Sequence, residues 1–363
     1  MHESDFERGF RNAPRLMALV LAALFIPGPR AQAYPIPPET LWALTQEAEW
    51  VVWADVEEVL ALPEDERERA QKVDWESGAV ARLRVREAWK GDARQGDQVE
   101  VHWIETICPA PPRYEEGLAV VAFLVRRAGK WRTVAMSYGT RYPASNDDAE
   151  AYRGAVTLAR DAQEKWTQER IVGRTGNLDA ARLDWQVLVS AHPATRWDGL
   201  YGLVPDGDSA HAFYDGRVRT PVALTGAQRE LLARGFVERP PLDRALPMML
   251  MALRGHEDAK VDLMAARAIE TMLSLDGPPD WVPQAFELLR ERRGEKLSRR
   301  RALTRKELLE RTFRDGRSGS SSGEWEGFDR EWTRFKQRHQ LTPALLPLPV
   351  EPPVPGTGGD SPL

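Results

Sequence analysis

Apolar residues occupy every second position in two consecutive runs between Ala79 and Ile104. The alternating positions are Ala79, Ala81, Leu83 and Val85, then Val99, Val101 and Trp103. Alternation with a period of two over this length predicts two half-buried β-strands. The polar segment 89–97, which contains two glycines, is typical of the turn between such strands. We expect the rest of the N-terminal half to add strands to this hairpin.

Three neighbouring segments have strand-like patterns. Residues 50–59 alternate between apolar and polar side chains, and 118–125 are apolar throughout, as in a strand covered on both faces. Residues 130–137 follow a turn at Gly129. Five short antiparallel strands in this region predict a small barrel, and the OB-fold is a common five-stranded kind. We therefore assign residues 34–144 to an OB-like β-barrel domain.

From residue 145 the chain carries apolar residues at helical spacing, separated by Gly, Pro and Asp. Short connections predict antiparallel helical hairpins, loosely HEAT-like, although we find no clean repeat period. The expected fold class is thus multidomain α+β, with an all-α domain at 145–317. We expect residues 318–340 to form a flexible linker and an amphipathic aromatic helix. Residues 341–363, rich in proline and glycine, are expected to be a disordered tail.

The N-terminus has the layout of a targeting segment. Three arginines precede an apolar run at 16–26, which is followed by helix-breaking residues and by Ala31-Gln32-Ala33. This order predicts a secretory signal peptide at 1–33, with cleavage before Tyr34 and no transmembrane segment afterwards. The protein is therefore expected in the periplasm or outside the cell. Because Cys108 is the sole cysteine, no internal disulfide can form, and core packing must provide the stability.

Residues 41–142 resemble a family of exported bacterial proteins, most of them of unknown function, with a netrin-like barrel. The matching stretches are Trp50–Val56, Arg84–Gly91, Cys108-Pro109, Tyr114–Gly117, Trp131 and Ser137–Gly139. The resemblance implies the barrel scaffold. In the related tissue inhibitors of metalloproteinases, an N-terminal cysteine binds the zinc of the protease. The mature chain expected here begins with Tyr34, so that inhibitory mechanism does not carry over.

Arg82, Arg84 and Arg86 fall on one face of the first hairpin strand. Three guanidinium groups on an exposed sheet face are suited to an anionic ligand, such as a phosphate, a sulfate or a uronate chain. The neighbouring strands place Asp55, Glu57 and Glu100 on what should be the same face. Cross-strand ion pairs with these carboxylates would neutralise the row, and we favour that alternative.

Four aromatic residues near the C-terminus follow helical spacing: Trp325, Phe328, Trp332 and Phe335. On a tethered amphipathic helix they are candidates for docking into the groove of a protein partner. The same stripe is equally suited to packing against the helical region of its own chain, which is the alternative we favour.

The sequence contains no recognisable catalytic or metal-binding motif, and we expect neither a cofactor nor a metal. A formal net charge of -5 argues against a nucleic-acid partner. We therefore predict a secreted or periplasmic, non-catalytic binding or scaffold protein. Two alternatives stay open. One is a hydrolase with its site at the domain junction, near His192, Asp198, His211 and Asp215; the other is an inhibitor of a secreted enzyme.

Overall fold

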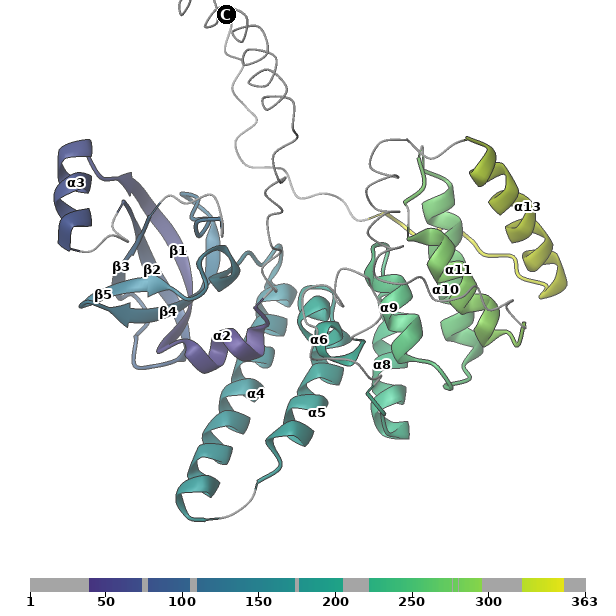
Figure 1. Cartoon of the computed structure of the whole chain (residues 1–363), viewed down its shortest axis with the longest axis horizontal. Coiled ribbons are helices and arrows are strands. Elements are labelled where there is room, and N and C mark those ends of the chain that lie inside the picture. Colours follow the sequence, from purple (N-terminus) through teal and green to yellow (C-terminus); the bar gives the residue numbers. More distant parts are fainter. Residues whose placement is uncertain are drawn as a thin grey trace, which may run out of the picture. The chain divides into compact units, whose positions relative to one another are not determined.

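The computed structural model describes residues 39–73, 78–104, 110–173, 176–204, 222–275, 277–279, 281–295 and 322–348. The chain is mixed α/β, with one sheet in its N-terminal part and helices in the remainder (Figure 1). The predicted signal peptide at 1–33 lies outside the described residues, as does Cys108.

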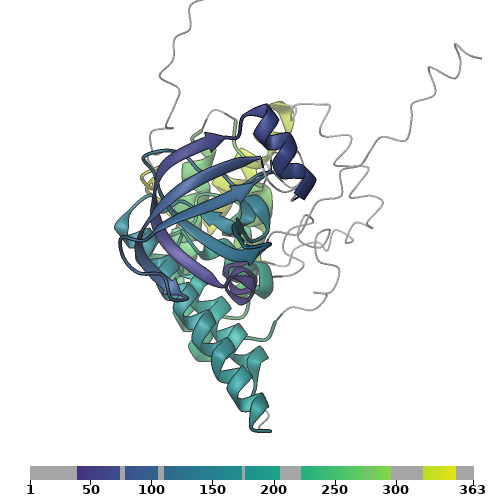
Figure 2. The ribbon, with the colours of Figure 1, turned by 90° about the vertical axis from the view of Figure 1, so that its left-hand side faces the viewer.

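Six strands form the sheet, in the order β1-β2-β3-β5-β4-β6. The strands are β1 (Trp50–Ala61), β2 (Ala79–Lys90), β3 (Gln98–Trp103), β4 (Ala119–Arg127), β5 (Lys130–Thr133) and β6 (Thr140–Arg141). Since β1 also pairs with β4, five of the strands close into a ring (Figure 2). The sequence predicts antiparallel pairing throughout, but β3 and β5 run parallel. A closed ring with an odd number of strands cannot alternate in direction all the way round, so at least one pair must be parallel.

In the central hairpin, the residues at the alternating apolar positions are buried in the structure, and the polar residues between them are more exposed. In β2, Leu83 and Val85 are buried inside the ring, whereas Arg84 and Arg86 between and beyond them are exposed. Between β1 and β2 the register shifts at three places, and such bulges increase the twist and bend that closure needs. The turn after β2 contains Gly91, whose φ of 93° and contact with the Trp50 ring leave no place for a side chain.

Helices precede, interrupt and follow the strands. They are α2 (Leu41–Glu47), α3 (Glu64–Val73), α4 (Asn146–Ile171), α5 (Leu178–Ser190), α6 (Arg196–Leu203), α8 (Gly226–Glu238), α9 (Ala245–Ala252), α10 (Ala259–Leu273), α11 (Val282–Arg292) and α13 (Ser322–Arg338), with a 3-10 helix, η1 (Met136–Gly139). Ser145 caps α4 by accepting a hydrogen bond from the Asp148 amide, and Thr225 forms a capping box with Gln228 at α8.

One apolar cluster joins strands and helices across residue 145. It contains Trp42 of α2, Phe123 of β4, Val156 of α4 and Trp185 of α5. The Trp42 and Trp185 rings meet edge to face at 5.4 Å, and Trp185 donates to the Ala155 carbonyl at 2.8 Å. α2 and α4 therefore cover the outside of the strands while a second cluster fills the ring. The domain boundary at 144/145 stays a prediction, although the sequence change from strands to helices falls there.

A third apolar cluster, formed by α8 to α11 and α13 with residues of α5 and α6, is the core of the C-terminal half. Residues 341–348, which the sequence assigns to a disordered tail, continue from α13 as extended chain along α10. Arg267 donates to the Ala344 carbonyl at 3.0 Å, and the Leu346 amide donates to Thr271 Oγ1 at 2.8 Å. Leu341 and Leu346 pack on the cluster, so these apolar residues and backbone bonds order the start of the tail. Residues 349–363 lie outside the described part.

Candidate binding site

The three arginines of β2 each contact acidic side chains on β1 or β3. Their partners are Glu58 and Glu100 for Arg82, Glu57 for Arg84, and Asp55 for Arg86. Arg86 holds Asp55 with two nitrogens and also lies over the Trp53 ring at 4.9 Å. The alternative of cross-strand neutralisation is therefore the arrangement that the structure contains.

These ion pairs stabilise the charged forms of their members. The hydrogen bond to Glu100 and the charge of Glu58 raise the pKa of Arg82. Hydrogen bonds from Arg84 and Gln98 lower the pKa of Glu57. An anionic ligand would have to displace these carboxylates to reach the guanidinium groups, so we do not place the candidate site on this face.

The aromatic stripe of α13 packs against the chain's own helices. The ring of Phe286 on α11 lies within 5.3 Å of the rings of Phe328, Trp332 and Phe335 in edge-to-face geometry. Trp332 and Phe335 are buried. The side chain of Trp325 lies outside the described residues. Of the two alternatives for this stripe, the structure contains the one in which the helix packs on its own chain.

Polar contacts add to this packing. Trp332 Nε1 donates to Glu270 of α10, and Lys336 Nζ lies 2.9 Å from both oxygens of the same carboxylate. The Lys336 ammonium also lies 5.5 Å from the Trp332 ring. Because these groups hold α13 against α10, the stripe is not a free surface.

His192, from the hydrolase alternative, belongs to a surface ion-pair cluster. Its Nδ1 accepts a hydrogen bond from the Ala194 amide at 3.2 Å, and its Nε2 lies 3.1 Å from Asp147 Oδ2 and 2.5 Å from Arg239 Nη1. Arg239 Nη1 lies 2.7 Å from the same oxygen. Hydrogen bonds from Arg239 and His192 lower the pKa of Asp147.

Asp198, from the same alternative, is buried elsewhere. Its Oδ1 accepts a hydrogen bond from the Leu41 amide at 2.8 Å and lies 3.5 Å from Arg141. Burial raises the pKa of this carboxyl, against the opposing effect of Arg141. His211 and Asp215 lie outside the described residues. The two described members of the set thus have separate structural contacts.

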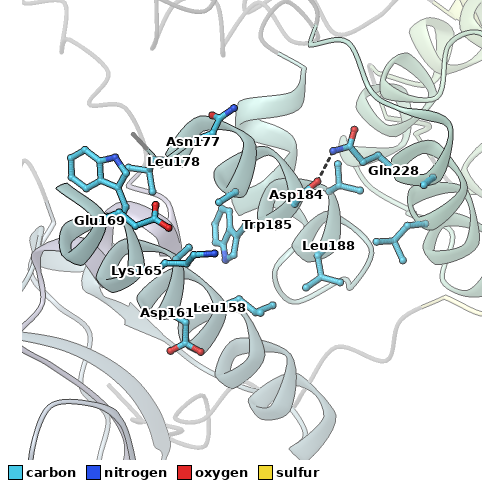
Figure 3. Close-up of a pocket in the computed structure, with 17 residues that line it drawn as sticks. Leu158, Asp161, Lys165, Glu169, Asn177, Leu178, Asp184, Trp185, Leu188 and Gln228 are labelled. Carbon is cyan, nitrogen blue, oxygen red and sulfur yellow. Dashed lines mark hydrogen bonds between the residues drawn. The ribbon is translucent and has the colours of Figure 1, made fainter. Parts of the chain in front are cut away.

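A groove of about 870 Å³ lies between α4, α5 and α8 (Figure 3). α4 and α5 form a hairpin, and each lines the groove with residues three or four apart. On α4 these include Leu158, Ala162, Lys165, Trp166 and Glu169; on α5 they include Leu178, Ala181, Trp185 and Leu188. The first turns of α8 complete the lining with Ala227, Gln228 and Leu231. This groove is the candidate binding site.

Apolar side chains dominate the groove, and a few polar groups lie among them. Leu158 is 44% exposed and Leu188 is 40% exposed, which is unusual for residues in a helix-lined hollow. Asp184 accepts a hydrogen bond from Gln228 at 2.6 Å, and this bond ties α5 to α8 (Figure 3). Lys165 and Glu169 form no ion pair with another described residue. The site can therefore bury an apolar surface and also pair with charges of both signs.

The sequence reasoning did not identify this groove. Tyr152, Val156 and Ala159 of α4 are buried against the strands and α5. Trp166 instead belongs to a second stripe with Leu158 and lines the groove. This second apolar stripe is the sequence feature that could have predicted the groove, because a helix that is apolar on two sides contacts two different surfaces.

Comparisons with protein-family models, with curated proteins and with solved structures find no match to this chain. The resemblance to exported proteins with a netrin-like barrel therefore stays an expectation. The described residues contain no group of three or more His, Cys, Asp or Glu side chains placed to hold a metal ion. Among the described helices, none is long and apolar enough to cross a membrane.

Proposed function

We propose that this protein is an exported, non-catalytic binding or scaffold protein whose α4/α5/α8 groove receives a helix from a protein partner. The observation that carries the proposal is the spacing of the lining residues. Positions 158, 162, 165 and 169 on α4, and 178, 181, 185 and 188 on α5, alternate steps of three and four. Such spacing forms the seam into which a further helix packs its own side chains.

The same proposal includes the finer features of the fold. The ring order β1-β2-β3-β5-β4-β1, with β3 parallel to β5, supports an OB-like barrel and agrees with the netrin-like resemblance. Consecutive helices joined by short turns support a HEAT-like stack of hairpins. Export rests on the layout of residues 1–33 in the sequence.

We prefer this function to the two alternatives. A hydrolase at the junction would need His192 and Asp198 to act together, and their contacts are to Asp147 and Leu41 respectively. An inhibitor would need a protruding segment that enters a protease, and no described feature favours one.

The proposal is tested with a photo-crosslinking amino acid at position 188 of the full chain, inside the groove. The matched control carries it at position 263, because Leu263 on α10 is 37% exposed, close to the 40% of Leu188. We expect only the probe at 188 to trap a defined peptide with apolar residues at helical spacing, identified by mass spectrometry. If the two probes trap the same peptides, or neither traps any, the groove is not a binding site.

A further inference from the structure

The α4–α5 hairpin carries more exposed apolar surface than the groove alone. Ile171 is 79% exposed and Val172 is 67% exposed, the highest values among the large hydrophobic residues of the described chain. Val172 lies three positions beyond Glu169 and continues the seam of α4 past the groove. A partner that fits this hairpin should therefore cover its tip as well as its groove.

The spacing of the seam positions on α4 is the same in both chain directions. Positions 162, 165, 169 and 172 are symmetric about residue 167. An antiparallel copy of the same helix, related by a two-fold axis near 167, places Ala162 opposite Val172 and Lys165 opposite Glu169. Both pairs occur twice across such an interface, as in any isologous contact.

The charged side chains of the groove indicate which charges a partner must carry. Asp161 forms an ion pair with Arg160, and Asp184 accepts a hydrogen bond from Gln228. Both carboxylates therefore already have a partner within the chain. The two seam charges that remain are Lys165 and Glu169, one of each sign. Within one helix, lysine four residues before glutamate is the weaker order for an ion pair. A partner that supplies both signs at the same spacing satisfies both groups.

We propose that the occupant of the groove is a second copy of this chain, with the α4–α5 hairpins of the two copies packed antiparallel as a four-helix bundle. This inference rests on the proposed function, because it names the partner whose helix enters the groove. The bundle covers Leu158, Leu188 and the tip of each hairpin, and it pairs Lys165 of each copy with Glu169 of the other.

Sedimentation velocity of the full chain tests the proposal, with circular dichroism to verify that each variant is folded. We expect the wild type to be dimeric and Leu188→Glu to raise the dimer dissociation constant at least about tenfold, since it buries a charge in the bundle. Leu263→Glu should remain dimeric. A monomeric wild type, or a dimer that survives Leu188→Glu or is equally lost in Leu263→Glu, overturns the proposal.

Charge reversal tests the antiparallel pairing itself. Lys165→Glu and Glu169→Lys each place like charges opposite one another, so the dimer of each variant should be weaker than the wild-type dimer. An equimolar mixture of the two variants should form a heterodimer about as strong as the wild-type dimer, because both 165–169 pairs across that interface are then Glu opposite Lys. A mixture that associates no better than the separate variants contradicts the pairing, and so does either variant alone if it dimerises as strongly as the wild type.

The crosslinking experiment at position 188 separates this inference from the proposed function. A trapped peptide from residues 146–190 supports both when it comes from a covalent product of two chains, because α4 of the same chain also lines the groove beside Leu188. A trapped helix from a different protein, together with a monomeric wild type, overturns the second-copy inference and leaves the proposed function standing. Absence of any specific product overturns both.

Discussion

At the scale of single residues, the crossing of the helices depends on glycines that leave no room for a side chain. A Cβ atom built on Gly235 of α8 would lie 2.5 Å from Ala191 Cβ and 2.7 Å from Ala191 Cα. Backbone atoms cannot move aside as a flexible side chain does, so the two segments can approach this closely only with glycine at this position.

We expect Gly235→Ala to lower the free energy of unfolding by about 1–3 kcal/mol, because the helices must move apart. Gly154→Ala on α4 is the matched control, since a Cβ atom at that position would have nothing within 4 Å. The control should stabilise the protein by about 0.5–1 kcal/mol through helix propensity. Urea unfolding measures both values, and a neutral Gly235→Ala would show that α8 does not pack closely on Ala191 in solution.

A second residue-scale prediction concerns Asp198, which links α6 to the first residue of α2. Asp198→Ala leaves the buried Leu41 amide without its acceptor and should cost about 1–3 kcal/mol. Asp198→Asn keeps an oxygen for Leu41, and burial already disfavours the charged form, so it should cost less. Chemical denaturation measures the free energy of unfolding of the two variants. Equal losses of stability would show that the charge of Asp198, and not its hydrogen bond with Leu41, stabilises this contact.

At the scale of elements, α13 is the segment whose role changes most between sequence and structure. Its stripe has the spacing of a partner-binding helix, yet Phe286 of α11 already contacts three of its aromatic rings. We expect Phe335→Ala to lower the free energy of unfolding by about 3–5 kcal/mol, because Phe335 is fully buried. Arg334→Ala, on the exposed side of α13, should change it by less than about 0.5 kcal/mol. Guanidinium unfolding provides the comparison, and a Phe335→Ala protein as stable as Arg334→Ala would mean that α13 is undocked in solution.

The end of α11 makes the docking of α13 dependent on pH. Burial alone would raise the pKa of Glu295, but hydrogen bonds from Arg290, Arg338 and His339 outweigh it and lower this pKa from 4.5 to about 2. The resulting stabilisation is fully present above pH 4.5 and is lost as the pH falls from 4.5 toward 2, since the unfolded state binds the proton more tightly.

We therefore expect the free energy of unfolding to fall more between about pH 5 and about pH 3 in the wild type than in Glu295→Gln. Glu287→Gln is the control, because Glu287 on α11 forms no ion pair with another described residue. Unfolding curves followed by tryptophan fluorescence measure the difference. Identical pH dependence in the wild type and Glu295→Gln would contradict the role of this carboxylate.

At the scale of the whole molecule, export is the prediction that depends on the sequence alone. We expect the secreted protein to begin at Tyr34, as read by N-terminal sequencing after expression in a bacterial host. Ala33→Arg should block cleavage, because the position before the cut requires a small residue. Gln32→Ala should be processed normally. Recovery of an uncleaved wild type from the cytoplasm would contradict the assignment.

Much of the fold was predictable because its signals are local. The alternation at 79–104 marks β2 and β3, and helical spacing with breakers marks α5, α6 and α8 to α11. The neutralised row on β2 was also predictable, since strand alternation alone places Arg82, Arg84 and Arg86 on the face of Asp55 and Glu57. The candidate site was not predictable, because its groove needs the distance and angle between α4, α5 and α8.

The sequence by itself determined the identity and the apolar face of most elements, because the periods of two and 3.6 belong to the backbone of each segment. Only the tertiary structure decided three further features: the parallel pairing of β3 with β5, the docking of α13 on α11, and the opening between α4 and α5. Each depends on contacts between segments far apart in the chain. Such contacts are selected by the total surface that the folded chain buries, and local patterns do not specify which surfaces meet.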